Sequence, residues 1–488
     1  MKRVINILLE KGPLLSGDLA QRLVDRYRVS SVAARQIISR SSEPVRKLFA
    51  LTFDNNQKYI YLDSHFASQD FYEGIIASLN KASKAYYAFV HPFIFQQGFI
   101  HKKQLAAYTF SPLKPLKGHK IAESIINDLL SAKIILEYND DCYQLNDGFD
   151  GGNYSRFRAI EIAKKITLEH FNDWARNINL IAYNSSKQLG PSAEFYKFQW
   201  SFTAPSYVGA GAKVDKKPTS FIVADILLGE QVKEADIDYF IKKLRIIRQG
   251  KKVSPFIPVL ITDGGIEDKA FKILKSEGVM LGFVDKLFGS TYSELLKSLV
   301  NVIENAAAVI SKNPEKFIQV MDNLTILEGK TYNLRGDLFE LAVGYYYYPI
   351  ARFFEVNKFI RDPKSGKRKE IDVFVKCSHN EIKVVECKGY RYPVELDYVN
   401  EWLTEKVPTI RSWLLSQDEF SKKDITFEIW STGGFTEEAE RVLEKMSKNT
   451  KKYTIRYFGS KEILEKSQRH EDENLRKILQ KYYLSDFK

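Results

Sequence analysis

The sequence predicts a multidomain α/β protein, and three observations support this fold class. The chain has 488 residues, of which 44% are hydrophobic, enough to bury several cores. Short helical patterns followed by apolar strand pairs fill the first third of the chain. Two strand–turn–helix patterns, typical of α/β domains, follow in the middle and at the C-terminal end. We therefore expect four domains, at residues 1–66, 67–150, 151–300 and 301–488.

The first domain is expected to contain three helices and a wing-like strand pair. Helical patterns cover residues 4–10, 16–27 and 30–38, and serines suited to helix capping begin the second and third. This arrangement resembles a winged helix, whose third helix enters a DNA groove in many proteins. The resemblance implies that Arg35 and Arg40 face DNA. Winged helices also mediate protein contacts, which is the alternative.

The second domain is expected to repeat this winged-helix-like plan. Its predicted elements are a helix that begins at His101, a candidate recognition helix at 121–130, and a strand pair at 134–138 and 142–145. Glu123 and Asp128 lie on the candidate recognition helix. Since carboxylates repel phosphates, DNA binding is less favoured here than in the first domain.

Two adjoining strands of the last domain carry acidic residues and a lysine. Asp372 lies in one apolar segment, and Glu386 and Lys388 lie in the next. Side chains alternate along a strand, so Glu386 and Lys388 share a face, and Cys387 offers its backbone carbonyl. Hard divalent ions prefer such oxygen ligands, and a lysine beside a metal-bound water can orient it, take its proton or stabilise developing charge. A charge pair on an exposed strand edge is the alternative, but the apolar run 382–385 argues against it.

Residues 331–460 resemble the PD-(D/E)xK nuclease superfamily, especially its type IV restriction endonuclease and Holliday-junction-resolvase-like branch. That family has a helix with a glutamate, a strand with an aspartate, a strand with (D/E)xK, and an α/β tail. Glu340 matches the helical motif, and Asp372 matches the second motif, although Ile371 stands where the literal motif has proline. The tail is matched by a strand at 425–430, a turn into a helix, and a further strand. The resemblance implies a C-terminal restriction-endonuclease-like α/β domain.

The same resemblance implies a set of site residues and a cofactor. Mg²⁺ would be bound by Asp372, Glu386, the carbonyl of Cys387 and Glu340, and Mn²⁺ could substitute. Lys388 would assist the attacking water. For Glu340, the alternative is an ordinary carboxylate in the first turn of a helix, stabilised by the helix dipole.

The middle of the chain contains an echo of the last domain. Residues 261–270 parallel residues 430–439, because both place a Gly-Gly turn between an apolar strand and a helix. Asp225 lies in the preceding strand, but Leu227 stands at the position that matches Lys388. The middle therefore resembles a degenerate nuclease-like domain, serving as a scaffold or a dimerisation surface. Chance similarity of two Gly-Gly turns is the alternative.

The charge distribution favours a polyanionic partner. The net charge is +12 and the pI is near 9.1. Basic residues gather in a turn before the Asp372 strand and in a helical segment after Lys388, which we expect to break at Pro408. A solvated hairpin tip is the alternative for the turn. The predicted DNA contacts are Arg35, Arg40, Lys364, Lys367, Arg368, Lys369, Lys406 and Arg411.

Together these features predict a Mg²⁺-dependent DNA endonuclease that acts in restriction or genome defence. One alternative is a DNA-binding regulator or assembly subunit that uses a nuclease fold as a platform. Another is a nuclease that acts on RNA or branched DNA. Double-strand cleavage favours a homodimer. Because the sequence has no Gly-x-x-x-x-Gly-Lys-Ser/Thr loop, any ATPase or other defence-system subunit would be a separate protein.

The sequence also predicts a cytoplasmic protein without membrane contact. The short apolar run at the start is interrupted by Glu10 and Lys11 before a secretory core develops. No stretch approaches the roughly 18 consecutive apolar residues of a membrane span. The cysteines show neither a paired disulfide framework nor zinc-ligand spacing.

Overall fold

The computed structural model describes a multidomain α/β protein, as its sequence predicts. The chain divides into two units, Met1–Phe157 with Thr167–Gly289 and Arg158–Ile166 with Ser290–Lys488. None of the helices within the described residues combines the length and apolar composition needed to cross a bilayer. The described residues are 1–149, 151–206, 208, 220–251, 253–312, 316, 319–320, 334–377, 380–470 and 472–484.

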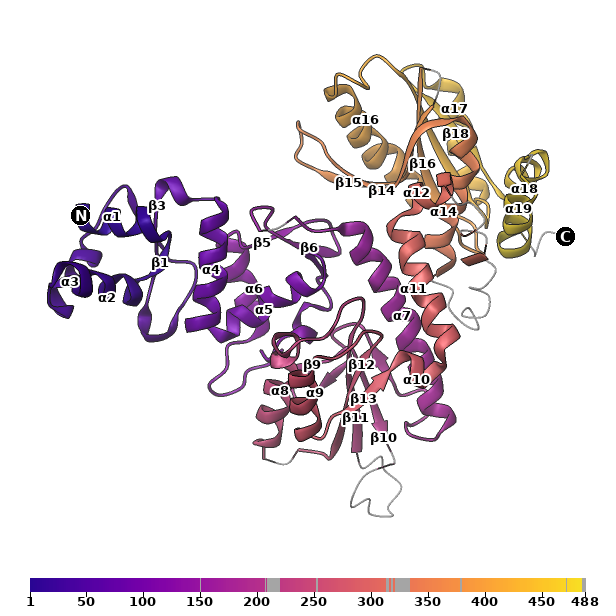
Figure 1. Cartoon of the computed structure of the whole chain (residues 1–488). Helices are drawn as coiled ribbons and strands as arrows, with labels where there is room; N and C mark the ends of the chain where they lie inside the picture. Colours follow the sequence, from indigo (N-terminus) through magenta and orange to yellow (C-terminus); the bar gives the residue numbers. More distant parts are fainter. Residues whose placement is uncertain are drawn as a thin grey trace. The chain divides into compact units, whose positions relative to one another are not determined.

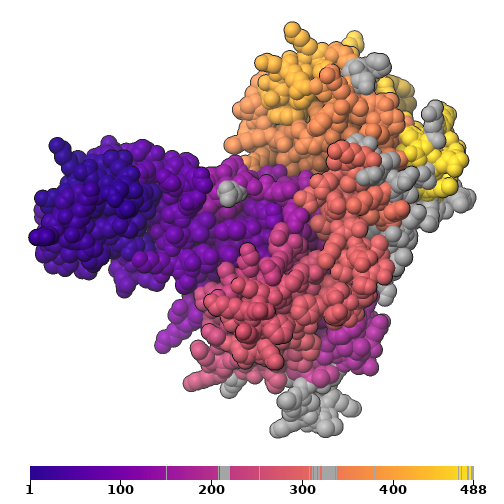
Figure 2. Space-filling view, in the orientation of Figure 1, coloured from indigo at the N-terminus to yellow at the C-terminus, as the bar shows by residue number. Residues whose placement is uncertain are grey.

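The N-terminal module contains three helices and a small sheet of order β1-β3-β2. The helices match the predicted ones, and the Ser30 hydroxyl caps the third by accepting a bond from the Ala33 N–H at 3.2 Å. In the space-filling view this module, in indigo, packs as one continuous body (Figure 2). The elements are α1 (Lys2–Lys11), α2 (Ser16–Tyr27), α3 (Ser31–Ser39), β1 (Leu14–Leu15), β2 (Val45–Leu48) and β3 (Tyr59–Leu62).

The second module also combines helices with a three-stranded sheet, of order β4-β6-β5. The helix predicted to begin at His101 is wrong. His101 instead ends a strand whose residues Phe99 and Ile100 are buried against β6, and only a short 3₁₀ turn, η3 (Leu105–Tyr108), follows. The other elements are α4 (Gln69–Ala82), α5 (Lys84–Phe95), α6 (Ala122–Ser131), β4 (Phe99–His101), β5 (Ile135–Glu137) and β6 (Cys142–Leu145).

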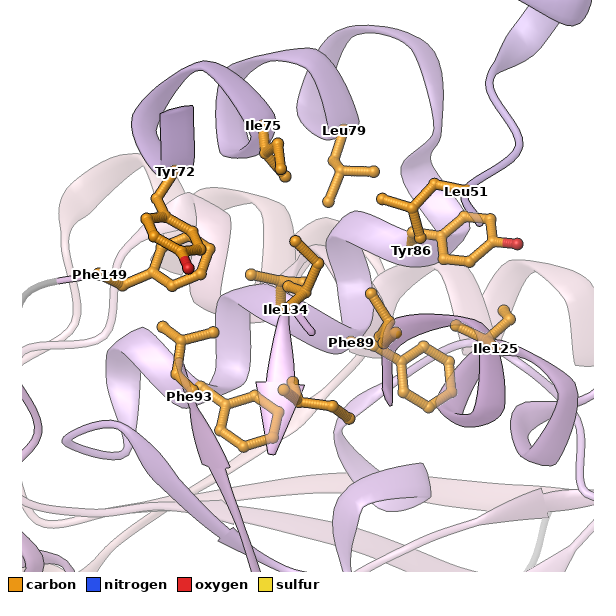
Figure 3. Close-up of a cluster of buried hydrophobic side chains, with 14 of the residues drawn as sticks. Leu51, Tyr72, Ile75, Leu79, Tyr86, Phe89, Phe93, Ile125, Ile134 and Phe149 are labelled. Atoms are coloured by element: carbon orange, nitrogen blue, oxygen red, sulfur yellow. The ribbon is translucent and has the colours of Figure 1, made fainter. Parts of the chain in front are cut away.

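A hydrophobic cluster links these two modules. Leu51 of the N-terminal module belongs to the same cluster as Ile75 of α4, Phe89 and Phe93 of α5, and Ile134 beside β5, and all five are fully buried (Figure 3). Burial of large apolar side chains is worth about 1.5–3 kcal/mol each. Helices α4 and α5 therefore hold the two modules together through a shared core.

Two five-stranded sheets follow, several of whose strands are labelled in Figure 1, and their strand orders give them the same topology. In each, three parallel strands continue into an antiparallel pair. The middle sheet has the order β13-β12-β11-β10-β7, and its elements are β7 (Lys187–Gln188), β10 (Phe202–Ser206), β11 (Ser220–Leu227), α8 (Glu234–Arg248), β12 (Phe256–Thr262), α9 (Asp268–Ser276) and β13 (Met280–Phe283).

The C-terminal sheet has the corresponding order β18-β17-β16-β15-β14. Its elements are α14 (Leu334–Tyr347), β14 (Ala351–Arg361), β15 (Arg368–Cys377), β16 (Glu381–Lys388), β17 (Asp424–Ser431), α17 (Glu437–Asn449) and β18 (Thr454–Phe458). The two predicted Gly-Gly turns join β12 to α9 and β17 to α17, at equivalent places in the two sheets. The shared topology supports a repeat rather than a chance similarity of turns.

Further helices complete the chain. The sequence predicts helices over residues 292–305 and 314–327 from their helical spacing of apolar residues. Helix α11 agrees with the first, whereas the second falls largely outside the described residues. The further helices are α7 (Tyr154–Asn177), α10 (Val284–Phe288), α11 (Ser290–Glu304), α12 (Ala306–Lys312), α18 (Ser460–Arg469) and α19 (Glu473–Ile478).

A buried ion pair lies at the centre of the middle sheet. The Nζ of Lys243, on α8, is 3.0 Å from Oδ2 of Asp225, on β11, and both side chains are 0% exposed. The ammonium also donates to the carbonyls of Ala107 at 2.6 Å and Gln199 at 2.9 Å, while the other carboxylate oxygen accepts the Ser201 N–H at 2.8 Å. Burial lowers the pKa of Lys243, and Asp225 opposes that shift. The pair is therefore fully enclosed and fully hydrogen-bonded.

Replacing Lys243 by methionine is expected to destabilise unit 1 by about 3–5 kcal/mol, because Asp225 would remain buried without its counter-charge. The matched control is Lys242→Met on the same helix, whose ion pair with Asp238 is nearer the surface and is worth about 0–1 kcal/mol. Urea unfolding of both variants measures the difference. Equal losses in the two variants would contradict the structural role of Lys243.

Candidate active site

Strands β15 and β16 bring Asp372 and Glu386 together. Val373 pairs with Val385, so the next residues, Asp372 and Glu386, face each other across the two strands. Both carboxylates are buried, with 7% and 3% of their residue surfaces exposed. The N–H of Cys387 donates to Oδ2 of Asp372 at 2.7 Å, which fixes that carboxylate against the neighbouring strand.

Lys388 joins these carboxylates as the alternation of side chains predicts. Its Nζ lies 3.0 Å from Oε1 of Glu386. Burial alone would favour the neutral Glu386 carboxyl, but Lys406 and Lys388 lower its pKa to about 2. The pKa of Asp372 is instead raised, first by burial and then by the adjacent Glu386. The site therefore concentrates negative charge, which nearby cations and hydrogen-bond donors stabilise.

Lys406 occupies a place that the sequence did not predict. The sequence predicts Lys406 as a phosphate contact. In the structure its Nζ forms an ion pair with Oε2 of Glu386 and lies 3.5 Å from Oδ1 of Asp372. The predicted helix break at Pro408 is wrong. The chain continues from α15 (Leu396–Glu401) through a π-helical turn, η5 (Trp402–Lys406), into α16 (Val407–Ser416), and the proline is in the first turn of α16, where its missing N–H is tolerated.

Tyr398 is a site residue that sequence reasoning missed. Its hydroxyl donates to Oε1 of Glu386, and its ring centroid lies 4.4 Å from Nζ of Lys388. The tyrosine thus orients the carboxylate and covers the lysine. No spacing rule marks it in the sequence, because its contact depends on how α15 packs against β16.

Glu340 lies on the predicted helix, α14, but it is held by an arginine. Arg158, on α7, places one guanidinium nitrogen 2.9 Å from Oε2 of Glu340 and the other 3.9 Å from Oε1 of Glu370. Burial raises the pKa of Glu370 to about 7, although Arg158 opposes this shift. Sequence reasoning missed both residues as members of this cluster, because their contact depends on Arg158, which lies far away in the sequence.

The oxygen donors fit a divalent cation such as Mg²⁺. Asp372 and Glu386 supply carboxylates, Cys387 can supply a carbonyl, and one ammonium already contacts both carboxylates. Within the described residues, no group of three or more His, Cys, Asp and Glu side chains has metal-binding geometry. The described donor set is therefore two carboxylates and a carbonyl, the oxygen ligands that would hold a hard divalent ion.

The basic turn before the Asp372 strand joins β14 to β15 in a hairpin that projects from the sheet (Figure 1). Asp362 organises the turn, because its carboxylate accepts the Ser365 hydroxyl at 2.6 Å, a contact that lowers its pKa to about 2. Gly366 has a φ of 69°, which glycine adopts without strain. The predicted phosphate contacts here comprise two exposed residues, Lys364 and Lys367, and two half-buried ones, Arg368 and Lys369.

The remaining predicted DNA contacts lie elsewhere. Arg411, on α16, lies over the Tyr453 ring at 5.7 Å. Arg35 lines a groove of about 750 Å³ in the N-terminal module, together with Lys47, Lys58 and the exposed Phe49. None of the described residues that line this groove is acidic. Arg40 lies at the C-terminal end of α3, outside the groove.

A double-mutant cycle on Arg158 and Glu340 is expected to reveal a coupling of about 0.5–3 kcal/mol. Arg158→Met alone should destabilise unit 2, because Glu340 and Glu370 would lose a shared cation in a largely buried setting. Adding Glu340→Gln should recover part of that loss. Urea unfolding of the wild type, both single variants and the double variant gives the coupling, and strictly additive losses would mean that the pair contributes nothing.

Comparison with known proteins identifies no family. No model of a known protein family matches this chain, and no curated protein matches it in sequence. The chemistry that the chain can perform is therefore inferred from the arrangement of Asp372, Glu386 and Lys388.

Proposed function

We propose that this protein is a metal-dependent endodeoxyribonuclease of the PD-(D/E)xK type. The observation that carries the proposal is the convergence of Asp372, Glu386 and Lys388 in one buried cluster on neighbouring strands. Such a concentration of charge is costly to bury unless it binds something. Phosphodiester hydrolysis requires these components, namely oxygen ligands for a metal and a cation for the transition state.

Each residue has a distinct role in this proposal. Asp372, Glu386 and the Cys387 carbonyl would hold Mg²⁺, which would supply Lewis-acid chemistry for attack of water on the phosphoryl group. Lys388 is held as an ammonium beside Glu386, so it would place positive charge where the attacked phosphate gathers negative charge. Tyr398 would keep the Glu386 carboxylate in position through its hydroxyl.

The architecture supports the same proposal. The C-terminal sheet follows a helix that carries Glu340 and has strands in the order that the family resemblance implies. The two N-terminal modules each combine helices with a three-stranded sheet, as winged helices do. The middle sheet repeats the C-terminal topology, but it has Leu227 in place of the lysine and a locked Asp225–Lys243 pair. We therefore assign it a scaffold role.

DNA is the partner that the basic surfaces favour. The β14–β15 hairpin carries exposed lysines beside the Asp372 strand, and the groove around Arg35 offers cations with no acid among its described lining residues. Cleavage of both strands would require two active sites, which a homodimer would provide. Restriction or genome defence is the biological setting that this activity favours.

The central test is Mg²⁺-dependent cleavage of plasmid, linear, branched and single-stranded DNA, and of RNA. Asp372→Asn, Glu386→Gln and Lys388→Met are each expected to lower the cleavage rate by about 10²–10³-fold, the effect of losing one transition-state contact. The strand offers a matched control, Glu381→Gln. Glu381 belongs to a second Glu-x-Lys sequence whose lysine, Lys383, pairs on the opposite face.

Cleavage that survives in Glu386→Gln would contradict the proposed centre. Binding of DNA by the wild-type protein without cleavage of any substrate would favour the alternative of a DNA-binding platform. Preferential cleavage of RNA or of branched DNA would keep the catalytic centre and change the substrate.

Removing the cations of the N-terminal groove is expected to weaken DNA binding and its dependence on salt. Each lost phosphate contact should reduce the slope of log K against log salt concentration by about 0.9. The variants are Arg35→Ala, Lys47→Ala and Lys58→Ala, and Lys11→Ala, whose side chain pairs with Glu10 outside the groove, is the control. Fluorescence anisotropy with labelled duplex DNA at several salt concentrations gives the slopes. Unchanged slopes in all three groove variants would exclude the groove as a phosphate-binding surface.

A further inference from the structure

An ammonium group from outside the two catalytic strands lies at the carboxylate pair. The Lys406 Nζ contacts Oε2 of Glu386 and lies 3.5 Å from Oδ1 of Asp372. The Lys406 side chain keeps 17% of its surface exposed. This cation therefore touches the same two carboxylates that would hold a divalent ion.

A local helix irregularity places Lys406 there. The π-helical turn η5 (Trp402–Lys406) ends at this lysine, and the N–H of Val407 donates to the carbonyl of Trp402. Trp402 and Val407 are buried in the core and anchor the turn on both sides. A π-helical turn inserts an extra residue relative to an α-helix and often occurs at functional sites. The backbone is thus shaped so that Lys406 points at Glu386.

The middle sheet contains a related acid–lysine pair in which the ammonium is completely enclosed. Asp225 occupies the register position of Glu386, and Lys243 reaches it from the helix that follows the strand. There the ammonium is locked, because it also donates to two backbone carbonyls, lies 4.0 Å from the Trp200 ring centroid and is 0% exposed. The Lys406 side chain, by contrast, keeps 17% of its surface exposed, and the ion pairs of its ammonium are with the two carboxylates themselves.

We propose that Lys406 is a tethered counter-cation that competes with the divalent metal for Asp372 and Glu386. This inference rests on the proposed function, because it requires a metal between those two carboxylates. When no metal is bound, the ammonium neutralises charge that burial would otherwise make very costly. A divalent ion and the ammonium cannot share the same oxygens without strong repulsion, so metal binding displaces Lys406. The lysine therefore sets the metal concentration at which the site fills.

The test compares Mn²⁺ binding by the wild-type protein, Lys406→Met and Lys406→Gln, measured by titration calorimetry on the full chain. Both variants are expected to bind Mn²⁺ about tenfold more tightly or better, since the ion no longer displaces an ammonium. Lys376→Met is the matched control, because this half-buried lysine lies on β15 but pairs with Glu419. Its Mn²⁺ affinity should equal that of the wild type.

A second readout keeps the proposal testable if a variant is less stable. Without metal, Lys406→Met should melt at a lower temperature than the wild type, and added Mg²⁺ should raise its melting temperature by more than that of the wild type. Equal or weaker Mn²⁺ binding by folded Lys406 variants, with ordinary binding by the wild type, would overturn the counter-cation role alone. Failure of the wild type to bind Mn²⁺ or Mg²⁺ would overturn the proposed metal site itself.

Discussion

The need to neutralise buried carboxylates is the constraint on which the candidate site depends. Glu386 and Asp372 face each other across β15 and β16 and are almost completely buried. Carboxylates in this setting are stable only beside cations or strong hydrogen-bond donors. Lys388, Lys406 and Tyr398 provide both, and they come from the strand itself and from the helical segment packed over it. The electrostatics of the site therefore depend on how that helical segment packs on the strands.

The two five-stranded sheets share one topology but neutralise their buried carboxylates in different ways. In the middle sheet, Ser201 faces Asp225 across the strands, and the single carboxylate accepts the Ser201 N–H and the Lys243 ammonium. Two backbone carbonyls accept the other bonds of that ammonium. In the C-terminal sheet, a second acid and a second lysine are present. The ammonium groups of Lys388 and Lys406 both form ion pairs with Glu386. The first arrangement is a closed structural ion pair. The second is a shared cluster, in which one ammonium contacts both carboxylates.

Local sequence patterns were sufficient to predict many of the helices and strands and the meeting of Asp372, Glu386 and Lys388. Strand alternation places Glu386 and Lys388 on one face, and the Gly-Gly turns mark where β12 and β17 lead into helices. Contacts between residues that lie far apart in the sequence could not be predicted from these patterns. The contacts of Arg158 with Glu340 and of Tyr398 with Glu386 depend on how helices dock, and a local pattern carries no information on docking. The helix predicted at His101 failed for the same reason, because pairing with β6 outweighed the local preference.

Strand β16 itself shows why a tripeptide cannot define an active site. It carries two Glu-x-Lys sequences, and alternation points Glu381 and Lys383 away from the face of Glu386. Lys383 pairs with Glu381 at 3.0 Å and with Glu428 of β17 at 3.1 Å, while Trp430 donates to the Glu428 carboxylate at 3.0 Å. That cluster also consists of an acid and a lysine within reach of a further acid, and its Lys383–Glu428 pair is buried, with 7% and 1% of the two side chains exposed. What distinguishes the Glu386 face is a second lysine, Lys406, whose ammonium contacts the carboxylates of two neighbouring strands at once, the contact on which the proposed competition with a divalent ion depends.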